Sequence, residues 1–233
     1  MFDADIAAVA RLFAQPVRAD IVLALMDGRA RTAGELAREA KVAASTASGH
    51  LAVLLDGGIL EMVAQGRHRY YRLADPAVAE VVEKMSALAP PRTPTSLRQS
   101  QRGDALGRAR TCYDHLAGRL AIDLCDAMVE HGIVRRGPDH FDVTPAGGEL
   151  LDRALALDVD EVGRRRRSFA PPCLDWTERR DHIAGAFGAA LLTAMLDRGW
   201  LRRRPDSRAI DVRPTGVDGL RTVFGLTVGD VFR

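Results

Sequence analysis

Hydrophobic and polar residues follow helical and extended patterns in turn along the first ninety positions. Apolar side chains recur at the three- and four-residue spacing of one helix face in five segments, 5–14, 17–27, 33–40, 44–56 and 76–88. Alternating segments at 59–64 and 68–73, around Gln65-Gly66-Arg67, predict a two-stranded hairpin. A helix, a tight turn, a second helix and a hairpin in this order predict a winged helix-turn-helix.

The remainder of the chain contains an internal duplication. The pentapeptide "DHLAG" at 114–118 returns as "DHIAG" at 181–185, and each is followed by an apolar helix, a glycine stop, two short strands and a proline. The predicted fold is therefore mainly α with small β-hairpins: an N-terminal winged helix-turn-helix followed by a duplicated winged-helix-like C-terminal domain. We expect three segments: 1–90 for DNA binding and dimerisation, a linker at 91–105, and a regulatory domain at 106–233 with repeats at about 110–157 and 177–226.

The helix at 44–56 begins with small polar residues and turns apolar only at Leu51. Small hydroxyls at a helix N-terminus fit a major groove, and a basic, glycine-containing hairpin tip fits the DNA backbone. Alone, each feature is equally typical of a helix cap and of a solvated turn. Their combination in the correct order favours DNA binding, through Ser45, Thr46, Ser48, Gly49, His50, Gln65, Arg67 and Arg69.

The segment "STASGHLAVLLDGGILEMVAQGRHRYYRL", together with "LFAQPVRADIVLALMDGRARTAGELA" before it, resembles the ArsR/SmtB family of bacterial winged-helix regulators. Over residues 5–85 this resemblance implies a homodimer that binds a pseudopalindromic operator and responds to a signal. The positions at which metal-sensing members hold their ions carry "ELAR" at 35–38 and a histidine-free helix at 76–88. We therefore expect no metal ion and no cofactor. For the dimer contact we expect the first helix and Val78, Val81, Val82 and Met85.

Composition restricts the compartment more than the function. Three cysteines without a disulfide framework, no bilayer-long apolar run and an N-terminus without basic residues predict a cytoplasmic protein with no membrane partner. A net charge of +2 neither requires nor excludes a nucleic-acid partner.

The helices of the two later copies are apolar and have no hydroxyl-rich start, so we expect them to pack together and to hold an effector at their seam. Placed one helical turn apart, Cys112 and His115 would share a face. The candidate effector-binding residues are Cys112, His115, Cys173, Trp176 and His182. Such residues are most often part of a structural core, and the functional alternatives are an oxidisable thiol, a thiophilic-ion site and an organic-ligand site. Among these alternatives the choice follows from the spacing of the cysteines. We favour the organic ligand, because cysteines on separate segments need not approach each other.

Taken together, these patterns predict a transcriptional regulator, a repressor, with an unidentified small-molecule or redox effector. A cysteine/histidine-dependent enzyme fused to a winged helix is the first alternative, and an input-free structural DNA-binding protein is the second. No glycine-rich nucleophile turn or phosphate loop is present in the sequence, so we predict no catalysis.

Overall fold

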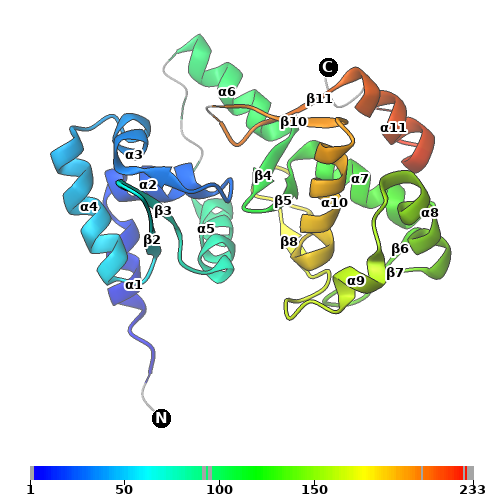
Figure 1. The fold of residues 1–233 in the computed structure, drawn as a ribbon, viewed down its shortest axis with the longest axis horizontal. Coiled ribbons are helices and arrows are strands. Elements are labelled where there is room, and N and C mark those ends of the chain that lie inside the picture. Colours follow the sequence, from blue (N-terminus) through cyan, green and yellow to red (C-terminus); the bar gives the residue numbers. More distant parts are fainter. Residues whose placement is uncertain (1–2, 91–92, 94–95, 206, 228, 230–233) are drawn as a thin grey trace. The chain divides into compact units, whose positions relative to one another are not determined.

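A computed structural model describes residues 3–90, 93, 96–205, 207–227 and 229 of the chain (Figure 1). These residues divide into two compact units, Met1–Val82 and Glu83–Arg233. Among the described residues, no helix combines the length and the apolarity needed to cross a membrane.

The first unit has the element order of a winged helix-turn-helix. Its helices are α1 (Ile6–Phe13), α2 (Pro16–Leu25), α3 (Ala33–Glu39) and α4 (Ala44–Asp56), and α5 (Pro76–Leu88) begins in it. Its antiparallel sheet has the order β1-β3-β2, with strands β1 (Arg31–Thr32), β2 (Leu60–Gln65) and β3 (His68–Leu73). The register pairs Gln65 with His68, so Gly66 and Arg67 form the tip of the wing.

Local sequence signals fix where these helices begin. Pro16 occupies the first turn of α2, where its missing N–H costs nothing. Thr32 and Glu35 form a capping box at the start of α3, as their spacing indicates. A core of apolar side chains that are at most 1% exposed then holds α2, α3 and α4 together: Ile21, Leu25, Leu36, Leu51 and Leu54.

The second unit contains two copies of one arrangement of elements. After α6 (Leu97–Arg108), the first copy contains β4 (Arg110–Cys112), β5 (His115–Ala117), α7 (Arg119–Glu130), β6 (Val134–Arg136), β7 (Phe141–Val143) and α8 (Pro145–Leu155). A short α9 (Val159–Gly163) leads to the second copy: β8 (Pro172–Leu174), β9 (Asp181–Ile183), α10 (Gly185–Asp197), β10 (Leu201–Arg203), β11 (Ile210–Val212) and α11 (Pro214–Phe224). The predicted helix–hairpin–helix order is present in both copies, and an extra hairpin precedes each.

These extra hairpins correct the expectation that Cys112 and His115 lie on a helix. The two residues face each other across the β4–β5 ladder, and Cys173 faces His182 across β8–β9. Tyr113, with φ of 58°, makes the tight turn of the first hairpin, and the helix starts only after Gly118. Strands of three residues are too short to show an alternating pattern, so these strands could not be predicted from local periodicity.

The two copies interlock through reciprocal backbone contacts. The N–H of Ile210 donates to the carbonyl of Ala109 at 2.9 Å, and the N–H of Phe141 donates to the carbonyl of Ala170 at 2.8 Å. Each copy thus pairs the segment before its first hairpin with the second hairpin of the other copy. Such reciprocal pairing is what an approximate two-fold relation between the halves produces.

One core is shared by both copies. Leu120 and Met128 of α7 and Phe187, Leu192 and Met195 of α10 are all fully buried in it. Burying each side chain of this kind stabilises a fold by about 1.5–3 kcal/mol. The two copies therefore form one domain with a common hydrophobic core.

The expected linker at 91–105 is partly helical. Helix α6 begins at Leu97, residues 91–92 and 94–95 lie outside the described residues, and the division between the units falls at Val82.

Candidate functional site

The first turn of α4 presents an open polar surface. Ser45, Thr46, Ser48 and Gly49 are exposed, and His50 is half-buried. The residue before the helix is Ala43, and among the described residues no side chain caps the N-terminal backbone N–H groups of α4. The alternative in which Ser and Thr serve as caps therefore does not describe this helix.

The wing tip adds positive charge to the same unit. Gln65, Arg67 and Arg69 are exposed on the β2–β3 hairpin. Among the described residues, the one hydrogen-bond partner of Arg67 is its neighbour: Nε donates to Nε2 of His68 at 3.5 Å. Its guanidinium keeps most of its donors for other partners.

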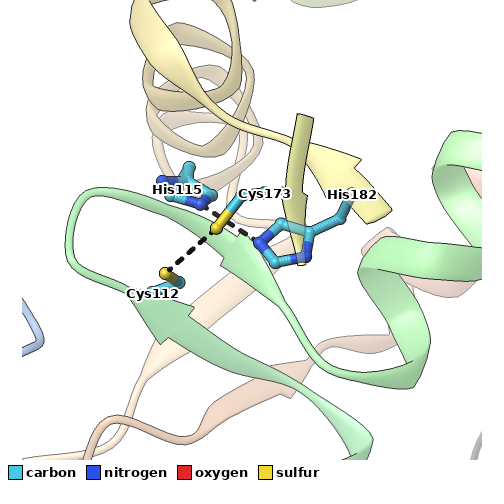
Figure 2. Close-up of side chains that lie close together, drawn as sticks. All are labelled: Cys112, His115, Cys173 and His182. Atoms are coloured by element: carbon cyan, nitrogen blue, oxygen red, sulfur yellow. Dashed lines mark hydrogen bonds between the residues drawn. The ribbon is translucent and has the colours of Figure 1, made fainter. Parts of the chain in front are cut away.

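A second group of side chains, the Cys/His cluster, lies in the second unit. It consists of Cys112, His115, Cys173 and His182, whose four candidate ligand atoms all lie within 4.8 Å of one another. Figure 2 shows the four side chains converging from the two extra hairpins. The Sγ atoms of the two cysteines are 3.8 Å apart, and the Nε2 atoms of the two histidines are 3.1 Å apart.

The approach of the cysteines overturns the argument by which we favoured an organic ligand. Each cysteine has its histidine as cross-strand neighbour, and strands β5 and β9 are in contact. Duplication of the hairpin therefore duplicates a Cys/His pair and brings the two pairs face to face. The spacing of the residues in the sequence does not indicate this contact, because the two pairs come from separate copies.

Burial and mutual contacts change the acid–base behaviour of the Cys/His cluster. Cys112, His115 and His182 are at most 4% exposed, and Cys173 is half-buried. The hydrogen bond with Cys112, helped by both imidazoles, outweighs burial and holds the pKa of Cys173 far below its usual value. The same hydrogen bond, together with burial, raises the pKa of Cys112. Burial alone lowers the pKa of His115, but hydrogen bonds with Asp114 and Cys173 outweigh it and raise that pKa to about 9.

Carboxylates stand behind both imidazoles. Oδ1 of Asp114 is 3.4 Å from Nδ1 of His115, and Arg167 binds Asp114 from the other side. Oδ2 of Asp175 is 3.8 Å from Nδ1 of His182, beyond hydrogen-bond reach, and this buried Nδ1 has no hydrogen-bond partner among the described residues.

Asp175 is anchored by a network of its own. It accepts hydrogen bonds from the Gly118 N–H at 2.7 Å and from the fully buried Arg110 at 3.0 Å. Burial opposes ionisation of Asp175, but the Arg110 charge and the hydrogen bonds from Thr177, Gly118 and Glu178 hold its pKa well below the usual range. A buried arginine thereby fixes the carboxylate next to His182.

Trp176 is not a member of the Cys/His cluster. Its ring covers the Arg110 guanidinium at 4.8 Å, which is a cation–π contact. At the expected seam, the structure has an apolar cavity between α7 and α10, lined by residues that include Leu116, Cys125 and Met195. It has room for about one water molecule, which is too little for an organic effector.

Comparison with known proteins shows which family this chain belongs to. A helix-turn-helix domain family matches residues 13–63. The HTH-type transcriptional regulator YdfF of Bacillus subtilis (strain 168) is 42% identical over 212 residues, which cover 91% of this chain and 93% of YdfF. The chain belongs to this family of helix-turn-helix transcriptional regulators. The predicted ArsR/SmtB-type winged helix is confirmed by the domain match and by the element order of the first unit.

Two solved structures that are similar to this regulator each cover little more than a third of it. The repressor BigR from Xylella fastidiosa is 26% identical, with a TM-score of 0.35 over 38% of this chain and 89% of BigR. The cadmium sensor CMTR from Mycobacterium tuberculosis is 28% identical, with a TM-score of 0.32 over 39% of this chain and all of CMTR, 100%. At these TM-scores neither likeness bears on the function of this regulator.

Sequence reasoning found the cluster residues of the regulator but missed their supports. Asp114 and Asp181 hold equivalent positions in the pentapeptide repeat, but only Asp114 lies beside its histidine, since Asp181 pairs with Arg136 at 3.3 Å and Asp175 stands behind His182. No sequence pattern indicated a role for Arg110 or Asp175, because arginine and aspartate are rarely buried and their pairing here is decided by the fold.

Proposed function

We propose that this regulator binds a pseudopalindromic operator as a homodimer, with α4 in the major groove and the wing on the DNA backbone, and that its second unit receives the controlling signal. The observation that carries the proposal is the uncapped, hydroxyl-rich N-terminus of α4. Its free N–H groups and positive helix end suit a phosphate, and its short side chains allow close approach to base edges.

Exposed apolar side chains support self-association. In α1, Ile6 is 75% and Val9 is 47% exposed, and in α5, Val81 is 44% and Met85 is 42% exposed. Val82, which we expected at the dimer contact, is only 6% exposed and therefore belongs to the core of the chain. Val78 is half-buried. Two-fold half-sites give specificity that one small winged helix does not achieve alone.

The experiment selects the preferred duplex from random DNA and measures its affinity as a function of salt for the parent, Arg69→Ala and Arg153→Ala. Arg153, on α8, is the matched control, because it is an exposed arginine outside the first unit. We expect Arg69→Ala to weaken binding to all sequences and to reduce the salt slope by about one, and Arg153→Ala to behave as the parent. The mass of the complex should correspond to two chains per duplex. Equal salt slopes for all three proteins, or one chain per duplex, would contradict the proposal.

A further inference from the structure

We propose that the Cys/His cluster binds one thiophilic divalent cation of the Zn²⁺ class and that this ion joins the two copies of the second unit. The inference deepens the proposed function by giving the second unit a ligand, but the binding of an ion is measurable whether or not the chain binds DNA.

The distance between the two sulfurs and the distance between the two ring nitrogens match those of a tetrahedral site. Zn–S bonds of about 2.3 Å and Zn–N bonds of about 2.0 Å place two sulfurs about 3.8 Å apart and two nitrogens about 3.3 Å apart on a tetrahedron. The Sγ atoms of Cys112 and Cys173 are 3.8 Å apart, and the Nε2 atoms of His115 and His182 are 3.1 Å apart. The four ligand atoms lie within 4.8 Å of one another, whereas sulfur and nitrogen ligands of a tetrahedral site are about 3.5 Å apart, so an ion would draw the cysteines and histidines together by up to about 1 Å.

The donors select the class of ion. Thiolate and imidazole suit Zn²⁺ and its thiophilic relatives, whereas Mg²⁺ and Ca²⁺ prefer oxygen ligands. Two thiolates also neutralise a dication, so the occupied site carries no net charge into an interior where Cys112, His115 and His182 are at most 4% exposed. Half-buried Cys173 marks the side from which an ion enters.

The carboxylates behind the histidines support the same conclusion. Ligating histidines commonly hold a carboxylate at their second nitrogen, which orients the ring and raises its basicity. Asp114 has this position for His115, and Asp175 lies 3.8 Å from Nδ1 of His182. Both Nε2 atoms consequently point to the centre of the cluster, as Figure 2 shows.

Two other uses of the cluster fit less well. A disulfide between Cys112 and Cys173 would engage two of the four groups and would leave two buried imidazoles facing each other. The seam cavity does not support an organic ligand at the cluster, since none of the four cluster side chains lines it and it holds about one water molecule. A single ion uses all four groups at once.

Binding involves no oxidation or reduction. Two metal–sulfur and two metal–nitrogen bonds form, any thiol or imidazolium proton on a ligand atom passes to solvent, and the ion loses its water ligands.

The test titrates the reduced, metal-free full chain with Co²⁺ and then Zn²⁺. We expect one Co²⁺ per chain with the visible bands of a tetrahedral site and a thiolate charge-transfer band, displacement by Zn²⁺, and a higher melting temperature of the second unit with the ion. Cys173→Ser should lose the spectrum. Cys125→Ser should keep it, because Cys125 lies in the apolar core outside the cluster. Asp114→Asn, which leaves all four ligands in place, should weaken binding about 10-fold.

X-ray absorption on the zinc-loaded parent keeps the test independent of whether a variant folds. It should show two sulfur neighbours at about 2.3 Å and two nitrogen neighbours at about 2.0 Å. A chain that binds no Co²⁺, a six-coordinate spectrum, a shell without sulfur, or equal binding by folded Cys173→Ser and Cys125→Ser would overturn the proposal. A chain that binds DNA but no Co²⁺ refutes only the metal site, and one that binds Co²⁺ but no DNA refutes only the proposed function.

Discussion

Helices α4 and α10 hold the same place in the same order of elements but have opposite surroundings. Each has 13 residues, is followed two residues later by a glycine with positive φ, Gly58 or Gly199, and then by a two-stranded hairpin. Three residues of α4 are buried, Ala47, Leu51 and Leu54, whereas α10 buries eight, among them Phe187 and Leu192. One face of α4 is left open for a partner, while α10 is enclosed by its own domain.

The difference shows how one structural unit acquires two uses. In the first unit the helix keeps a polar, uncapped N-terminus. In the second unit the duplicated helices bury their apolar side chains in one shared core, and the hairpins that precede them carry the Cys/His cluster. The helix–hairpin–helix order therefore does not reveal function, which depends on whether the helix surface is exposed or buried.

The largest expected effect is on the stability of the second unit, through a residue of the buried helix α10. Phe187→Ala removes a fully buried ring that stacks on Phe169, and should cost about 3–5 kcal/mol of unfolding free energy. Both tryptophans, Trp176 and Trp200, lie in the second unit, so tryptophan fluorescence during urea denaturation reports its unfolding. Val217→Ala, at a 37% exposed position of the same unit, is the control and should change stability by less than about 0.5 kcal/mol. A loss below about 1 kcal/mol for Phe187→Ala would show that α10 is not enclosed as described.

The next effect is on DNA binding. Ser48→Glu places a negative charge and a longer side chain on the open face of α4, and should lower affinity for the selected duplex about 1,000-fold, to the non-specific level. Thr193→Glu on α10 is the matched control: Thr193 is also exposed, and its hydroxyl donates to the carbonyl four residues earlier, as that of Ser48 does. Fluorescence anisotropy should show parental affinity for the control. If both variants lose the duplex equally, the recognition surface is not on α4.

The smallest effect concerns the missing cap of α4. Ala43→Ser supplies a hydroxyl to the free N–H groups and should stabilise the helix by about 1 kcal/mol, seen as slower hydrogen exchange over residues 44–56. Affinity for DNA should fall at the same time, because the hydroxyl occupies donors that would meet a phosphate. Ala52→Ser, exposed in the middle of the same helix, has no cap to form and should slow no exchange. Tighter DNA binding by Ala43→Ser would argue against a phosphate at this position.

Much of the first unit could be predicted from local signals. The proline at the start of α2, the capping box of Thr32 and Glu35, and the glycine between two alternating strands act within a few residues, so the chain itself records them. The polar start of α4 was equally visible. The burial of Val82 could not be predicted, because the residues of a helix do not indicate which neighbouring element will cover each of its faces.

In the second unit the sequence by itself determined that a unit is duplicated, that its helices pack, and which cysteines and histidines recur near their starts. Only the tertiary structure decided that Cys112 and His115 face each other across a hairpin and that this pair meets Cys173 and His182. The same holds for Asp175, which replaces Asp181 beside His182, and for the buried Arg110 that anchors it. Strands of three residues are stabilised by pairing with segments far along the chain, such as Ala109 with Ile210, and no local pattern encodes such a partner.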